Sequence, residues 1–262
     1  MSNLKPIRIK INGRHVSVPA YHIGQGAYPH IRALLTALAL DYTVDYQVDA
    51  NGPYVNILTD PKAPASKPLS GRRITISAAH GAGRNVSPCD PSYNESDFVL
   101  DVALELEEML IAGGAIVHLP RRRKNEDMSL SERTNRIAKF GADITIDLHT
   151  DAIGEGCNTQ ARGAHAIHQV SRPNDPLALA IVQEVAKAMG IPPARSRPIW
   201  TKEGQTGFDW YHMLRVPHGH NIIVEAGFHS SRDDVKVLIQ GGAARKYAQG
   251  VRNGLLRFYE VM

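Results

Sequence analysis

The amino-acid sequence predicts an α/β fold, a twisted, mostly parallel sheet flanked by helices, preceded by a small ββαββ α+β domain. From residue 71 onward, short β-branched runs alternate with helical patterns, which is typical of a parallel sheet covered by helices. Up to residue 58 the apolar residues instead alternate around Asn-Gly pairs, which is typical of hairpins. A proline-rich stretch over 59–70 separates the two parts as a semi-extended linker.

The small module covers residues 1–58. Alternating apolar residues around Asn12-Gly13 and around Asn51-Gly52 predict two hairpins, and helical spacing predicts a helix over 29–40. A module of this length buries only a marginal core. It contains no cluster of catalytic type, so we expect binding or dimerisation, with a purely structural appendage as the alternative.

The large module covers residues 71–262. Its best-marked element is a helix over 95–112, where Asn94 stands at the N-cap position, Tyr93 and Phe98 occupy the places of a hydrophobic staple, and Gly113-Gly114 ends the helix. The other elements follow from the same periodicities. We predict strands over 74–77, 115–119, 144–148, 163–168 and 221–224, and further helices near 129–140, 176–189 and 242–259.

Composition narrows the class of partner. An aromatic content of 6% disfavours a nucleic-acid site built by base stacking. The net charge of +4 and pI of about 9.1 fit a polyanion such as a cell-wall polymer, DNA or a membrane surface, and fit equally a basic protein without such a partner. The chain starts without an apolar leader and contains no membrane-length apolar run. We therefore expect synthesis in the cytoplasm and no membrane insertion.

Two further features leave alternatives open. The dense basic run 121–124 (Arg-Arg-Arg-Lys) predicts a solvated loop, with contact to substrate as the alternative. Cys89 and Cys157 allow at most one disulfide. Sequence does not show whether they pair, so two free thiols are the default expectation.

Three predicted strands lead to residues that can bind or assist a metal, namely His80, His149 and Glu225. Because ligands of open α/β sheets bind at the carboxyl ends of the strands, these side chains predict one shared site. Glu95, on the first turn of the 95–112 helix, is a fourth candidate. The alternatives are hydrogen-bonded core histidines, and a Glu95 that merely favours the positive end of its helix.

Together these residues indicate a catalytic zinc site. His80, Glu95 and His149 would leave Zn²⁺ with three protein ligands and an open position for water, whose pKa the metal lowers. Such chemistry needs a separate carboxylate as general base and later acid. Glu225 fits this role because it follows an apolar run, where burial raises a carboxyl pKa.

A wider set of motifs falls in the same order and at similar spacing to those of a known family, over about residues 72–259: His80-Gly81, Glu95, Leu130 with Arg133, Ala142-Asp143, Leu148-His149 and Val224-Glu225-Ala226-Gly227-Phe228. This region resembles the zinc-dependent N-acetylmuramoyl-L-alanine amidases of the Amidase_3 type. The resemblance implies one Zn²⁺ per chain on His80, Glu95 and His149, with Glu225 catalytic. It also implies hydrolysis of the amide between N-acetylmuramic acid and L-alanine in peptidoglycan.

The chain departs from the family at two places. Residues 77–79 read Ser-Ala-Ala where Asp-Pro-Gly is usual, and residues 147–151 read Asp-Leu-His-Thr-Asp where Ser-Ile-His-Ala-Asn is usual. Neither change removes a ligand, and both bear on the contacts that orient the histidines. His229 and Arg121 are further residues that could line the cleft.

The resemblance also suggests a setting. Residues 1–58 resemble, more weakly, the small domain found beside some cell-wall enzymes and named after the N-terminal domain of copper amine oxidases, which suggests wall binding or a homodimer and implies nothing about copper. Without a leader, a phage or prophage endolysin released by a holin, or an enzyme freed by lysis, is expected. The rival functions are a zinc peptidase or carboxypeptidase acting on wall peptides, and a wall-binding protein without turnover.

Overall fold

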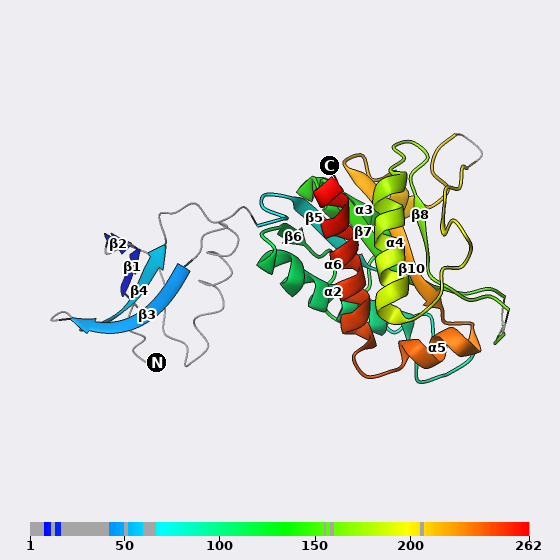
Figure 1. The fold of residues 1–262 in the computed structure, drawn as a ribbon, viewed down its shortest axis with the longest axis horizontal. Coiled ribbons are helices and arrows are strands. Elements are labelled where there is room, and N and C mark those ends of the chain that lie inside the picture. Colours follow the sequence, from blue (N-terminus) through cyan, green and yellow to red (C-terminus); the bar gives the residue numbers. More distant parts are fainter. Residues whose placement is uncertain are drawn as a thin grey trace.

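The computed structural model contains two sheets (Figure 1). It describes residues 67–154, 156–157, 160–204 and 207–260 in full, and only the backbone of residues 8–11, 14–16, 42–49, 52–59 and 261. The predicted helix over 29–40 and most of the predicted linker lie outside these residues. The division into two modules therefore stays a prediction.

The first sheet is four-stranded, with the order β2-β1-β4-β3. Its strands are β1 (Arg8–Ile11), β2 (Arg14–Val16), β3 (Tyr42–Asp49) and β4 (Gly52–Thr59). The antiparallel pairs β1–β2 and β3–β4 are the two expected hairpins, and β1 runs parallel to β4. The β3–β4 ladder ends at the pair Asp49–Gly52, so the hairpin turns where Asn51-Gly52 predicts it.

The second sheet is six-stranded, with the order β6-β5-β7-β10-β8-β9. Its strands are β5 (Arg73–Ala78), β6 (Ile116–His118), β7 (Ile144–Asp151), β8 (His165–His168), β9 (Ile199–Trp200) and β10 (His220–Phe228). The strands β6, β5, β7 and β10 run parallel, while β8 is antiparallel to β10 and β9 is parallel to β8. This confirms the mostly parallel sheet.

Helices cover both faces of this sheet. They are α2 (Glu95–Ala112), α3 (Leu130–Phe140), α4 (Asp175–Met189), α5 (Arg232–Leu238), α6 (Ala243–Val261) and the 3-10 helix η2 (His212–Arg215). On one face α6 packs against α2 and α4 (Figure 1). Val224 of β10 belongs to the core beneath these helices, whereas Ile223 beside it packs against Leu214 of η2. Adjacent residues of a strand point to opposite faces, so both faces are buried. None of the helices in the described part is long and apolar enough to cross a membrane.

The start of α2 has the predicted local signals. The Asn94 side chain accepts a hydrogen bond from the backbone N–H of Asp97 at 3.1 Å, which is an N-cap. The rings of Tyr93 and Phe98 lie 5.4 Å apart, as a hydrophobic staple requires. These contacts hold the first turn of α2, and with it Glu95, in one place.

Several elements differ from the prediction. β7 and β10 are longer than expected, so His149 and Glu225 lie within strands and not after them. The periodicity does not predict β9, η2 or α5, because elements of two, four and seven residues are too short to show a period.

Cys89 and Cys157 form a disulfide, so the default expectation of two free thiols is wrong. The two cysteines are 68 residues apart in sequence. They follow β5 and β7, which are neighbouring parallel strands, and this topology brings their loops together.

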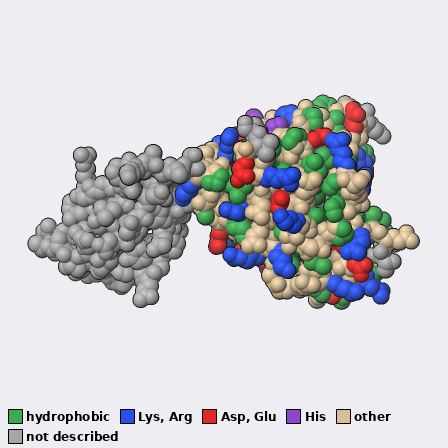
Figure 2. Space-filling view, viewed as in Figure 1, with side chains coloured by type: hydrophobic (Ala, Val, Ile, Leu, Met, Phe, Trp, Pro, Cys, Tyr) green, Lys and Arg blue, Asp and Glu red, His purple; other side chains and the backbone are tan. Residues whose placement is uncertain are grey.

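The surface over the α2, α4 and α6 layer carries charges of both signs. Figure 2 shows Lys and Arg side chains interspersed with Asp and Glu on the described part of this face. It does not present the continuous basic stripe that nucleic-acid binding favours.

Candidate metal centre

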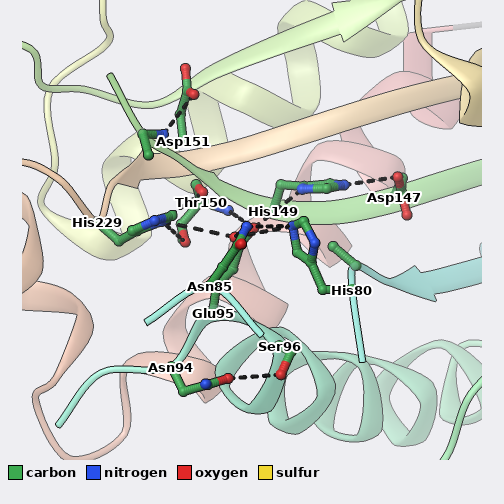
Figure 3. A network of polar contacts seen from close by, with 12 residues as sticks. His80, Asn85, Asn94, Glu95, Ser96, Asp147, His149, Thr150, Asp151 and His229 are labelled. Atoms are coloured by element: carbon green, nitrogen blue, oxygen red, sulfur yellow. Dashed lines mark hydrogen bonds and ion pairs between the residues drawn. The ribbon is translucent and has the colours of Figure 1, made fainter. Parts of the chain in front are cut away.

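The structure brings His80, Glu95 and His149 together at the carboxyl edge of the six-stranded sheet (Figure 3). The Glu95 carboxylate lies between the two rings: Oε2 is 3.2 Å from Nε2 of His80, and Oε1 is 3.2 Å from Nδ1 of His149. One potential ligand atom from each residue lies within 4.8 Å of the others. The expected convergence of the strand ends therefore occurs, while the role of the three side chains as ligands stays a prediction.

The ligand atoms point toward a common place. The Asn85 amide nitrogen donates to Oε2 of Glu95 at 2.9 Å and lies 3.0 Å from Nε2 of His80. A single N–H₂ group thus reaches both atoms, so these two potential ligand atoms face the same region. This two-histidine, one-carboxylate set fits Zn²⁺, which is bound through imidazole nitrogen and carboxylate oxygen in catalytic sites.

Glu95 is buried and ionised. Its residue is 1% exposed, and Oε1 accepts a hydrogen bond from the backbone N–H of Thr150 at 2.9 Å. Burial alone raises the pKa of Glu95, but the hydrogen bonds from His149 and His80 outweigh it and hold the pKa below its ordinary value. The carboxylate is therefore charged, as a metal ligand must be.

His149 lies between two carboxylates. Nδ1 faces Glu95, and Nε2 lies 2.9 Å from Oδ2 of Asp147, two residues earlier on β7 (Figure 3). Burial lowers the pKa of His149, but the charge of Asp147 and its hydrogen bond more than compensate, and the pKa lies well above its ordinary value. This position therefore stabilises positive charge, which is the electrostatic property that a cation site requires.

Glu225 lies beside His149, because β10 and β7 pair in parallel with these two residues in register. Glu225 is 7% exposed, and its Oε2 has no hydrogen-bond partner. Burial raises the pKa of Glu225 well above its ordinary value; His149 opposes the increase, and Asp151 and Glu95 add to it. A carboxyl group in this environment holds a proton more readily than an exposed one and is suited to proton transfer.

The backbone around His80 is held in an unusual conformation. His80 has φ +53°, in the left-handed region that costs a side-chain-bearing residue roughly 1–2 kcal/mol. Gly81 follows because a Cβ there would lie 2.5 Å from the carbonyl oxygen of Glu126. The buried Arg133 guanidinium donates to the carbonyl oxygen of His80 and fixes this turn.

The prediction of a solvated loop for the basic run 121–124 is wrong at Arg121. The expected solvated loop holds for Arg122, but Arg121 is 1% exposed. Its guanidinium donates to the carbonyl oxygens of Ala79 and Ser96, each at 2.9 Å. Arg121 therefore connects the segment that carries His80 to the first turn of α2, and does not line the cleft.

The candidate centre opens into a cleft of about 590 Å³. His229 lies in its wall as expected, and its Nδ1 lies 2.9 Å from the carbonyl oxygen of Thr150. The opposite side is formed by residues of α3 and of the η2 segment, including Leu130, Tyr211 and Met213. The cleft can therefore admit a substrate next to Glu225 and the three candidate ligands.

Sequence reasoning assigned no contact to two residues that support the site, although it noted the departure from the family pattern at Asp147. Asp147 carries the in-strand contact to His149, and its signal was the alternation of Asp147 and His149 on one strand face. Tyr247 of α6 donates its hydroxyl to the carbonyl oxygen of Val224 at 2.6 Å and is fully buried. No local pattern marks Tyr247, because its partner lies on a distant strand.

Comparison with known proteins identifies related chains. The family described as N-acetylmuramoyl-L-alanine amidase matches residues 74–257. The amidase LytC of Bacillus subtilis (strain 168) is 23% identical over 192 residues, 73% of this chain and 36% of LytC. The amidase CwlM of Bacillus licheniformis is 25% identical over 190 residues, 72% of this chain and 69% of CwlM. This chain thus spans about a third of the length of LytC.

Solved structures share the fold of this chain. The catalytic domain of the amidase CwlV from Bacillus (Paenibacillus) polymyxa var. colistinus has a TM-score of 0.60 and 22% identity, covering 73% of this chain and 99% of that domain. The amidase CwlD of Clostridioides difficile, solved with the GerS lipoprotein, has a TM-score of 0.63 and 20% identity, covering 73% of this chain and all (100%) of CwlD. At these identities the likeness shows the fold alone.

Proposed function

The chain belongs to the N-acetylmuramoyl-L-alanine amidase family, and from this we propose that it is a zinc-dependent amidase of peptidoglycan. The bond cleaved is the amide between N-acetylmuramic acid and L-alanine. The observation that carries the proposal is the buried Glu225 carboxyl, with one oxygen lacking a hydrogen-bond partner, beside the cluster of His80, Glu95 and His149.

In the proposed enzyme Zn²⁺ is held by His80, Glu95 and His149. When bound there, the ion would polarise the substrate carbonyl and lower the pKa of the attacking water towards about 7. Arg133 and Arg121 hold the segments that carry His80 and Glu95. Their contacts keep the ligands in place before the metal binds, which reduces the cost of organising the site.

Glu225 is the proton carrier. Its carboxylate takes a proton from the attacking water and passes it to the nitrogen of the departing L-alanine, so that the leaving group is a neutral amine. The Oε2 atom supports this assignment, because it has no hydrogen-bond partner among the described residues and can therefore accept the proton. The raised pKa of Glu225, caused by burial, suits both halves of the transfer.

The wider role follows from the same proposal. We expect a wall-lytic, endolysin-like enzyme that meets peptidoglycan after holin-type release or cell lysis. Wall binding or self-association by residues 1–58 stays a prediction.

The test uses purified sacculi and the full chain loaded with Zn²⁺. The proposal expects new amino termini on L-alanine, their loss after chelation, and their return when Zn²⁺ is restored. Amino termini on other residues of the peptide stem would indicate a peptidase instead. Binding to sacculi without release of amines would indicate a wall-binding protein without turnover.

A further inference from the structure

We propose that Asp147 is a positioning residue of the metal centre, which holds the His149 ring in the tautomer that offers Nδ1 to the metal. The inference rests on the proposed function, because it assigns Asp147 a role toward the Zn²⁺ that this function requires.

Strand β7 places the Asp147 side chain next to that of His149. Asp147 and His149 are two residues apart on β7, so their side chains share the face that lines the cleft. Oδ2 of Asp147 lies 2.9 Å from Nε2 of His149, and Nδ1 on the other side of the ring lies 3.2 Å from Oε1 of Glu95. Figure 3 shows the His149 ring contacted by Asp147 on the side away from Glu95.

The contact with Asp147 affects which nitrogen of the His149 ring can bind a metal. A neutral histidine ring has one N–H and one nitrogen lone pair, and a metal requires the lone pair. A carboxylate only accepts hydrogen bonds, so the contact with Asp147 requires the proton on Nε2. Glu95 faces Nδ1 in the same way, so without metal both ring nitrogens can carry a proton. When Zn²⁺ binds, it would displace the proton on Nδ1, while Asp147 keeps the proton on Nε2.

The burial of Asp147 supports this role. Asp147 is 2% exposed, and its Oδ1 has no hydrogen-bond partner. Burying a carboxylate is costly unless it is paired. His149 is the main partner that offsets this cost for Asp147, ahead of the charge of Arg133 and the Ser77 side chain. Outer carboxylates paired in this way orient metal-bound histidines and make them stronger ligands.

Asp147 does not belong to the ligand cluster itself. The group of mutually close ligand atoms contains His80, Glu95 and His149, and Asp147 lies against the opposite ring nitrogen of His149. We therefore assign Asp147 a supporting role. The loss of such an outer partner typically weakens metal affinity by roughly 10–100-fold.

The test compares Zn²⁺ affinity in full-length variants by competition with a chromophoric chelator. Asp147→Asn replaces the carboxylate by an amide, whose oxygen is a weaker and uncharged acceptor for the Nε2 proton, so we expect Zn²⁺ affinity to fall by roughly 10–100-fold. Histidine side-chain ¹⁵N NMR of the Zn²⁺-loaded wild-type chain should show the metal on Nδ1 of His149 and the proton on Nε2, and the reverse arrangement would overturn the role of Asp147. Asp147→Ser, which removes the carboxylate without adding an amide, should also weaken binding and serves if the Asn variant does not fold.

The matched control is Asp175→Asn. Asp175 and His168 form another carboxylate–imidazole pair, also at 2.9 Å, that lines a different hollow of the surface. This variant removes the same charge and should leave Zn²⁺ affinity unchanged. Thermal unfolding of each metal-free variant separates a loss of folding from a loss of affinity.

The outcomes separate this inference from the proposed function. If the wild-type chain binds Zn²⁺ and both Asp147 variants bind it equally well, the role of Asp147 is wrong and the amidase proposal stands. An equal loss in Asp175→Asn would also overturn the role, because the effect would then be one of general charge. If the wild-type chain itself fails to bind Zn²⁺, the proposed function fails first.

Discussion

Replacing Arg121 by methionine should destabilise the catalytic region by about 3 kcal/mol, because methionine fills much of the space but cannot donate. Arg121 gives charge-assisted hydrogen bonds to the carbonyl oxygens of Ala79 and Ser96, each at 2.9 Å. Such bonds contribute about 1.5–3 kcal/mol each, and a buried carbonyl left unpaired costs about 1–3 kcal/mol. Removing the buried guanidinium also removes its desolvation penalty, which keeps the net loss near the lower end of the sum.

Thermal unfolding measures this loss. In a domain of this size a loss of about 3 kcal/mol lowers the melting temperature by roughly 6–12 °C. Arg122→Met is the matched control, because the Arg122 side chain is about half exposed and pairs with Glu107 through two hydrogen bonds of 2.6 Å. Exposed pairs contribute about 0–1 kcal/mol, and the bidentate geometry places this pair near the upper end of that range. If Arg121→Met lowers the melting temperature no more than Arg122→Met, the connection between the two ligand-bearing segments is not the role of Arg121.

Three further predictions follow from the same structure. Glu225→Gln should reduce the rate of amine release from sacculi by about 10²–10⁴-fold with Zn²⁺ content unchanged, because the proton carrier is lost; a rate within tenfold of wild type would exclude that role. Tyr247→Phe removes the hydrogen bond to the carbonyl oxygen of Val224 and should lower the free energy of unfolding in urea by about 1 kcal/mol, whereas an unchanged midpoint would show that this bond adds nothing. Reducing the Cys89–Cys157 disulfide, which joins residues 68 apart, should cost about 2–4 kcal/mol in thermal unfolding. The double variant Cys89→Ser, Cys157→Ser should no longer respond to reductant, and a wild-type chain equally indifferent would contradict the prediction.

Local patterns predicted the elements that have local causes. The helix α2 begins at Glu95 as expected, because its cap and staple involve residues within five positions of one another. Five of the six strands of the large sheet were predicted from their apolar runs, but β9 was not, and β7 and β10 extend further than those runs. The extension depends on pairing between strands, and the polar residues His149 and Glu225 at their ends carry no strand signal of their own.

The candidate site was likewise predicted in part, where the cause is local, and missed where the cause is a contact between distant segments. Sequence order was enough to bring His80, His149 and Glu225 to one sheet edge, because parallel strands present their carboxyl ends together. It was not enough to show that Arg121 turns inward, since a run of four basic residues has the composition of a solvated loop. The inward position depends on two carbonyl oxygens that distant segments supply.

The sequence by itself therefore determined the fold class, the order of the elements and the residue types that can carry the chemistry, because periodicity, caps and spacing are properties of neighbouring residues. Only the tertiary structure decided which side chains touch. The carboxylate of Asp147 on His149, the pairing of Cys89 with Cys157 and the burial of Arg121 all join groups through space. The physical reason is that hydrogen bonds, ion pairs and disulfides act over a few ångströms, and folding sets those distances independently of separation along the chain.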